Sequence, residues 1–244
     1  MNMKRGWKLK RDAKNQEREL KLKLKSEYKR ELTRQRNEPP VLTKQEEIFN
    51  AVSHGAGIPM AAACMMILLF KSDTAWKIAA ALIYGISMLF MMSVSCIYHA
   101  MPTGSNAKRI CRRFDYASIY LLIGGTFAPI LLVYLGGKPG VALFCAQWCV
   151  IITGVWITLI FGPGRWRWLP FVLYFTLGWS GLGFIKSFHT HAPILLWFIL
   201  MGGLAYTLGM IPFVRKRKYD HCAWHIFVLA GAVLQWLGIC TQIY

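Results

Sequence analysis

The sequence predicts an all-α integral membrane protein, built as a bundle of seven transmembrane helices. Three observations predict this class. Hydrophobic residues make up 55% of the chain and charged residues 16%, whereas a soluble domain carries about 25% charged residues. The charged residues are concentrated near the N-terminus, and the rest of the chain contains seven long apolar segments. These segments are continuous, unlike the alternating segments of roughly ten residues that form a membrane barrel.

The first 50 residues differ in composition from the rest. They contain 15 Lys/Arg and 8 Asp/Glu, which leaves 14 Lys/Arg and 3 Asp/Glu for the other 194 residues. We therefore expect a basic tail over residues 1–44 and a transmembrane domain over residues 45–244. The tail contains helix-forming residues without a wide apolar face, and Pro39 and Pro40 should end any helix there.

The partners of the tail follow from its charge. The net charge of the chain is +18, but it is shared between the tail and the connections between spans. We expect the tail to bind anionic lipid headgroups and not nucleic acid. No apolar segment occurs within the first 40 residues, so the first span is expected to be the insertion signal itself.

The seven predicted spans are separated by short connections. Each span is near the ~20 residues that a helix needs to cross the hydrocarbon core. The connections contain helix breakers, as at Pro102 and Gly104 and in residues 136–140 and 162–164. Pro129 lies inside the third span and predicts a kink there. The spans are expected over residues 48–70, 76–99, 114–134, 141–161, 168–187, 193–213 and 221–243.

The connections also predict the orientation. The tail and the connections on its side of the membrane contain 25 Lys/Arg, and those on the other side contain 4. Without the tail the ratio is still 10 to 4. Lys and Arg are retained on the cytoplasmic side. We therefore expect a multi-pass protein of the cell membrane, with a cytoplasmic N-terminus and an external C-terminus.

Histidines collect at the predicted cytoplasmic ends of the spans, where ionisable groups often mark functional sites. His221 and His225 are spaced i, i+4, so they share a helix face about 6 Å apart and can bind one metal ion. His99 ends the second span at the same depth. The sequence thus predicts a metal site with ligands His99, His221 and His225. The alternative is that these histidines face headgroups or cap helices. His189 and His191, spaced i, i+2, are expected in an outer surface loop.

Other polar residues extend this prediction. Three imidazoles and a water form a catalytic zinc site with an open position. Asp115, at the start of the third span, could act as the base for that water, and Ser95 could orient the scissile group or stabilise an oxyanion. Glu47, Asn50 and His54 share one face at the start of the first span, where they could orient the metal ligands.

Four segments resemble the hemolysin III family, which is grouped with the progestin and adipoQ receptors (PAQR) and, more distantly, with the alkaline ceramidases. They are residues 46–55, 95–99, 114–127 and 221–231. The resemblance covers about residues 45–244. It implies seven helices, a cytoplasmic N-terminus and a zinc ion near the inner leaflet.

The resemblance also implies roles for individual residues. His99, His221 and His225 match the zinc ligands, and Asp115 and Ser95 match the family's aspartate and serine. In the receptor branch this site is associated with the hydrolysis of lipid amides such as ceramide. The leading hypothesis is a zinc-dependent hydrolase that acts on amide or ester bonds of membrane lipids. The alternatives are a receptor or membrane-homeostasis regulator with structural zinc, and a pore-forming hemolysin.

Overall fold

The structure is a computed structural model that describes the backbone of residues 2–244 and the side chains of Trp7 and of residues 14–244. The chain divides into two units, Met1–Glu38 and Pro39–Tyr244. The first unit is the single helix α1 (Asn2–Asn37). It ends just before the two prolines, as predicted, because proline cannot continue a helix. The described side chains of α1 are mostly exposed.

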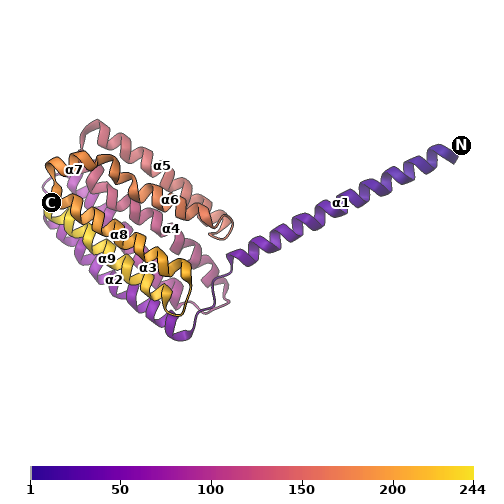
Figure 1. Cartoon of the computed structure of the whole chain (residues 1–244), viewed down its shortest axis with the longest axis horizontal. Coiled ribbons are helices and arrows are strands. Elements are labelled where there is room, and N and C mark those ends of the chain that lie inside the picture. Colours follow the sequence, from indigo (N-terminus) through magenta and orange to yellow (C-terminus); the bar gives the residue numbers. More distant parts are fainter. Residues whose placement is uncertain (1) are drawn as a thin grey trace. The chain divides into compact units, whose positions relative to one another are not determined.

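The second unit contains seven helical spans long and apolar enough to cross a membrane, which confirms the predicted fold class (Figure 1). The third span changes helix type at residue 129, and the fifth is interrupted by a short 3₁₀ turn. The helices are α2 (Lys44–Phe70), α3 (Ala75–Ala100), α4 (Asn106–Ala128) with the π-helix Pro129–Leu135, α5 (Gly137–Phe161), α6 (Trp168–Trp179), the turn Ser180–Phe184, α7 (Ile185–His191), α8 (Pro193–Arg215) and α9 (Asp220–Gln242).

Polar caps place the helix starts near the candidate site. At the start of α2, Thr43 and Glu46 form a capping box, in which each side chain accepts a hydrogen bond from the backbone N–H of the other residue. The helix α4 begins eight residues before the predicted residue 114, because the Ser105 hydroxyl accepts a hydrogen bond from the Lys108 N–H at 3.1 Å. The basic residues near position 110 therefore lie in a helix and not in a connection.

Pro129 changes the type of helix in the third span. The backbone continues as a π-helix from Pro129 to Leu135. A proline inside a helix lacks an N–H group and clashes with the carbonyl four residues earlier, so the wider π-helix accommodates it. The helix type therefore changes at Pro129, the residue at which the sequence predicts a kink.

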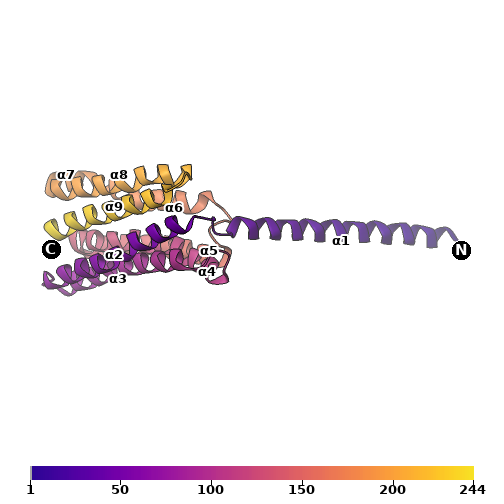
Figure 2. The ribbon, with the colours of Figure 1, turned by 90° about the horizontal axis from the view of Figure 1, so that it is seen from below.

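The helices pack in the order α8, α9, α2, α3 and α4, and α5 and α6 pack on α4 (Figures 1 and 2). Glycines permit close approaches between them. A Cβ at Gly125 would lie 1.9 Å from Ser87 Oγ, and one at Gly231 would lie 2.9 Å from the ring of Tyr206. Close packing of this kind holds helices together in lipid, where there is no hydrophobic drive for association.

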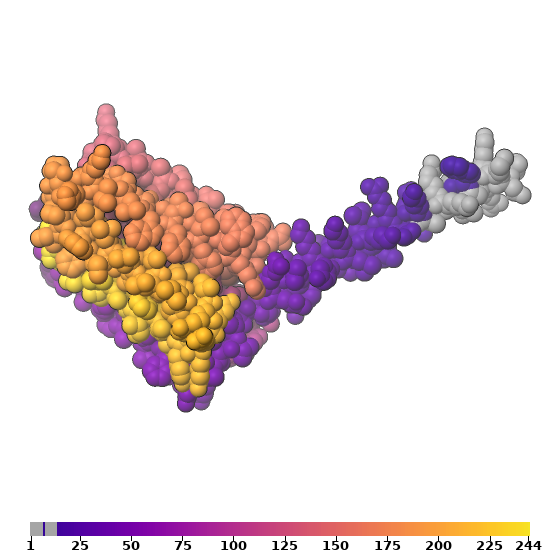
Figure 3. Space-filling model, viewed as in Figure 1, coloured from indigo at the N-terminus to yellow at the C-terminus, as the bar shows by residue number. Residues whose placement is uncertain are grey.

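The outer surface of the bundle is apolar, as expected for a surface in contact with lipid. The helices α8 and α9, in orange and yellow, form much of the face seen in Figure 3. Large side chains of α8 such as Trp197 and Ile211 are more than half exposed. The two histidines His189 and His191 are exposed as predicted, but they lie in the helix α7 and not in a loop.

A tight turn over residues 216–219 joins α8 to α9. Lys216 and Tyr219 adopt left-handed backbone conformations, with φ of 58° and 63°. The Asp220 carboxylate accepts hydrogen bonds from Arg215 Nε at 2.9 Å and from the Arg217 N–H at 2.7 Å. This turn sets where α9 begins, and therefore which side of the helix faces the bundle.

Candidate metal centre

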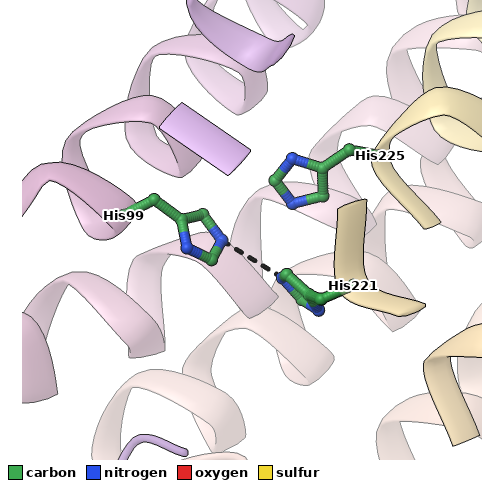
Figure 4. A group of neighbouring side chains, drawn as sticks. All are labelled: His99, His221 and His225. Atoms are coloured by element: carbon green, nitrogen blue, oxygen red, sulfur yellow. Dashed lines mark hydrogen bonds between the residues drawn. The ribbon is translucent and has the colours of Figure 1, made fainter. Parts of the chain in front are cut away.

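Three histidines from two helices meet near one end of the bundle (Figure 4). His99 lies in the last turn of α3, and His221 and His225 lie in the first two turns of α9. Their ring centroids form a nearly equilateral triangle with sides of 4.9, 5.0 and 4.8 Å. One potential ligand nitrogen from each ring lies within 4.8 Å of the others.

This spacing suits metal coordination. The Nε2 atoms of His99 and His221 are 3.1 Å apart. Tetrahedral zinc with Zn–N bonds of about 2.0–2.1 Å holds its ligand nitrogens roughly 3.3 Å apart. His99 and His225 are buried, and His221 is partly buried. The three side chains could therefore hold a metal ion in a site largely shielded from the surroundings.

The opposite ring nitrogens of two of these histidines already have partners. His99 Nδ1 lies 2.8 Å from Glu47 Oε2. His225 Nδ1 lies 3.2 Å from the Asn50 carbonyl oxygen and 3.0 Å from Ser53 Oγ. Metal-bound histidines in proteins almost always use their second nitrogen in this way, which fixes the ring and its tautomer. Both rings thus direct Nε2 toward the common point, so the residues present fit a metal ion.

The residues expected around the ligands lie beside them in three different ways. Glu47 contacts His99 through its carboxylate, and Asn50 contacts His225 through its backbone carbonyl. His54 stacks on His225, with centroids 3.7 Å apart and planes 3° from parallel. The side-chain polar atoms of Asn50 and His54 are buried and have no hydrogen-bond partner in the part of the chain that the structure describes.

Two neighbours of the site were missed by the sequence reasoning. Ser53 contacts His225, and its position three residues after Asn50 was an available signal, because both lie on the same helix face. Lys108 forms an ion pair with Glu47 and is fully buried. No spacing in the sequence identifies it, since the contact depends on how α4 packs against α2 and α3.

Asp115 and Ser95 lie on the deeper side of the histidines. Both line a cavity of about 130 Å³ together with His221 and His225. The structure thus brings the predicted aspartate and serine to the same cavity as two of the three histidines.

The cavity extends from this polar end between α4, α6, α8 and α9. Apart from its polar end, aromatic and aliphatic side chains form most of its wall. Gly178 and Phe175 of α6 line it and are both exposed, so the cavity is accessible along this helix. The aromatic lining includes Phe171, Tyr174, Phe175, Phe213 and Trp224.

Comparison with known proteins places the chain in a family. A model of the family described as "Haemolysin-III related" matches residues 42–236. The chain is 31% identical to the Hemolysin-3 homolog of Bacillus subtilis (strain 168), over 84% of this chain and 96% of that protein. It is 32% identical to Hemolysin-3 of Bacillus cereus, over 82% and 92%. A more distant relative is the human monocyte to macrophage differentiation factor of the PAQR family, at 24% over 83% and 86%. This multi-pass membrane protein therefore belongs to the haemolysin-III related family.

Proposed function

We propose that this protein is a zinc-dependent hydrolase of amide or ester bonds in membrane lipids. One observation carries the proposal: three histidines converge on one point, and two of them line the polar end of an apolar cavity together with an aspartate and a serine. Imidazole is a preferred ligand of zinc, and three such ligands leave a position open for chemistry. Bound zinc would supply a Lewis acid that activates water and polarises a carbonyl.

The remaining chemistry is assigned to residues of the chain. Asp115 would accept the proton of the attacking water and return it to the leaving amine or alcohol. Ser95, which lines the same cavity as Asp115, would orient that carboxylate and the scissile carbonyl. Glu47 and the Asn50 carbonyl would hold the ligand rings in place.

The cavity favours a lipid as substrate. A substrate whose reactive carbonyl lies near the histidines would place its hydrocarbon chain along the aromatic wall formed by residues such as Phe171 and Phe213. That chain would pass from lipid into an equally apolar cavity, so its fit would depend on close packing against this wall and not on a hydrophobic gain. An opening along α6 at the exposed Gly178 would let the lipid enter from the membrane without passage through water.

The orientation and the lipid contacts of the tail belong to the same proposal. The histidine end of the bundle carries the Lys/Arg-rich helix ends around residues 108–113 and 215–218, so it is assigned to the cytoplasmic side. On this assignment α1 lies in the cytoplasm, where its 14 Lys/Arg against 5 Asp/Glu favour binding to anionic headgroups. Labelling of single cysteines placed near residue 30 and residue 244, in intact cells and in inverted vesicles, tests the assignment.

The central experiment combines metal analysis with lipid hydrolysis. Purified wild-type protein is expected to contain about one zinc per chain and to release fatty acid from a ceramide or a related lipid amide. Asp115→Ala should keep its zinc and lose hydrolysis. A metal-free preparation with full activity contradicts the proposal.

A structural role for zinc is the competing function. Under that role, Ser95→Ala and Asp115→Ala would retain both zinc and any signalling output, because neither residue is needed to hold the metal. Loss of hydrolysis with zinc retained in both variants would support the hydrolase, and an unchanged signalling output would support structural zinc.

A further inference from the structure

Lys108 is a fully buried lysine in a helix that spans the membrane. A buried charge of this kind is costly unless it is paired and hydrogen-bonded. Its Nζ atom lies 2.9 Å from Glu47 Oε1, and it donates hydrogen bonds to the carbonyl oxygens of Tyr98 at 3.2 Å and Met101 at 3.1 Å. The ion pair and the two hydrogen bonds together compensate the buried ammonium group.

All three partners of Lys108 adjoin His99. Tyr98 precedes His99 in the chain, and Met101 follows two residues later, at the C-terminal end of α3 where backbone carbonyls lack helical partners. A cation there also complements the negative end of the helix dipole. The third partner, Glu47, uses its other oxygen to accept from His99 Nδ1 at 2.8 Å.

We propose that Lys108 is a positioning residue for the metal centre, which fixes Glu47 and, through Glu47, the ring of His99. The chain of contacts runs from Lys108 Nζ to one carboxylate oxygen, and from the second oxygen to His99 Nδ1. It ties α4 and α2 to the last turn of α3. Without Lys108, the carboxylate loses the partner that holds its orientation, and His99 Nε2 is no longer directed toward His221.

A double-mutant cycle on zinc affinity tests this role. The variants are Lys108→Met, Glu47→Gln and the double variant, and the dissociation constant is measured by competition with a chelator. Each single change is expected to weaken zinc binding about 10- to 100-fold, the range seen when a partner of a ligating histidine is removed. If Lys108 acts through Glu47, the double variant should bind zinc no more weakly than Glu47→Gln alone. The proposal is overturned if the double variant loses zinc affinity by the product of the two single-variant factors. It is also overturned if Lys108→Met binds zinc as tightly as the wild type.

Lys77 provides a matched control. It lies in α3, the helix of His99, and pairs with a carboxylate, Asp73, at 3.1 Å, but at the opposite end of that helix from His99. Lys77→Met should leave zinc affinity unchanged. If Lys108→Met does not fold, Lys108→Gln keeps two N–H donors on a slightly shorter side chain and removes the charge and the third donor, and the same cycle applies.

The inference rests on the proposed zinc site, so a second measurement separates the two. Nitrogen-15 NMR of the histidine rings in metal-free protein reports whether His99 carries its proton on Nδ1. Wild-type protein should show the Nδ1–H form, and Lys108→Met should show a mixture of tautomers. Wild-type protein without zinc affinity refutes the metal centre, whereas an unchanged His99 tautomer in Lys108→Met refutes the role of Lys108.

Discussion

Two pairs of closely spaced histidines lie at helix ends in this protein, and their surroundings differ. His221 and His225 on α9 are one helical turn apart, face the bundle and meet His99 from α3. His189 and His191 on α7 are two residues apart, so they point to nearly opposite sides of their helix, and both are exposed. The pair on α9 thus has a third imidazole from a second helix beside it, whereas the pair on α7 belongs to no such group among the described residues.

The largest expected effect comes from the histidines themselves. His225→Ala removes one of the three ligands, so bound zinc should be lost at concentrations where the wild type is saturated. His191→Ala removes an exposed imidazole of the same type and should leave the zinc content unchanged. Metal analysis of both purified variants checks this pair. Equal zinc content in the two would remove the distinction between the buried and exposed pairs.

Two adjacent glutamates give the next test. Glu47→Gln should weaken zinc binding about 10- to 100-fold, because the amide is a poorer acceptor for His99 Nδ1 than the carboxylate. Glu46 caps α2 and accepts the Tyr219 N–H at 2.9 Å, so Glu46→Gln should lower thermal stability with little change in zinc affinity. Chelator competition and thermal unfolding are measured on both variants. The reverse assignment of effects would show that the capping residue, and not Glu47, supports the metal.

Two glycines test the apolar cavity independently of the metal. A Cβ at Gly178 or at Gly183 would have no other atom within 4 Å, so a larger side chain fits at either position. Of these two glycines, Gly178 lines the cavity and Gly183 does not. Gly178→Leu should lower kcat/KM for a lipid amide about tenfold, because it narrows the lipid-facing opening, with zinc content unchanged. Gly183→Leu is the control, and equal activity in both variants would exclude this entry route.

The smallest effect is expected at Ser53. Its hydroxyl contacts His225 Nδ1, but the Asn50 carbonyl remains as an alternative partner. Ser53→Ala should therefore weaken zinc binding only about 2- to 10-fold, the equivalent of one neutral hydrogen bond. Ser72→Ala removes a hydroxyl that donates to the Leu68 carbonyl at 2.8 Å, away from the histidines, and should have no effect on zinc. A loss as large as that of His225→Ala would mean that Asn50 does not support the ring.

The sequence predicted the helical spans more closely than it predicted their contacts. Continuous apolar runs identify spans without any knowledge of packing, and Pro129 marked the place where the third span changes type. The predicted start of α4 was too late, because the polar residues after Ser105 have the composition of a connection. The Ser105 cap nonetheless starts the helix there.

The site was predictable to the extent that its residues share a helix face. The i, i+4 spacing of His221 and His225 grouped those two residues correctly on one side of α9. The contact of Lys108 with Glu47 and the depth of the cavity depend on how separate helices pack, and no local spacing contains that information. For the same reason, Lys108 could be read only as one charge among those that predict orientation.

The short turn between α8 and α9 limits how the length of this connection can change. Each residue inserted into a helix rotates everything after it by about 100°. An extra residue that extended the first turn of α9 would therefore carry His221 and His225 away from His99 together, with no ligand altered. The connection over residues 216–219 cannot easily accommodate an extra residue. Two of its residues have left-handed backbone conformations, and the Asp220 contacts hold it to Arg215 and Arg217. For the proposed zinc site, the number of residues in this connection would itself be a requirement.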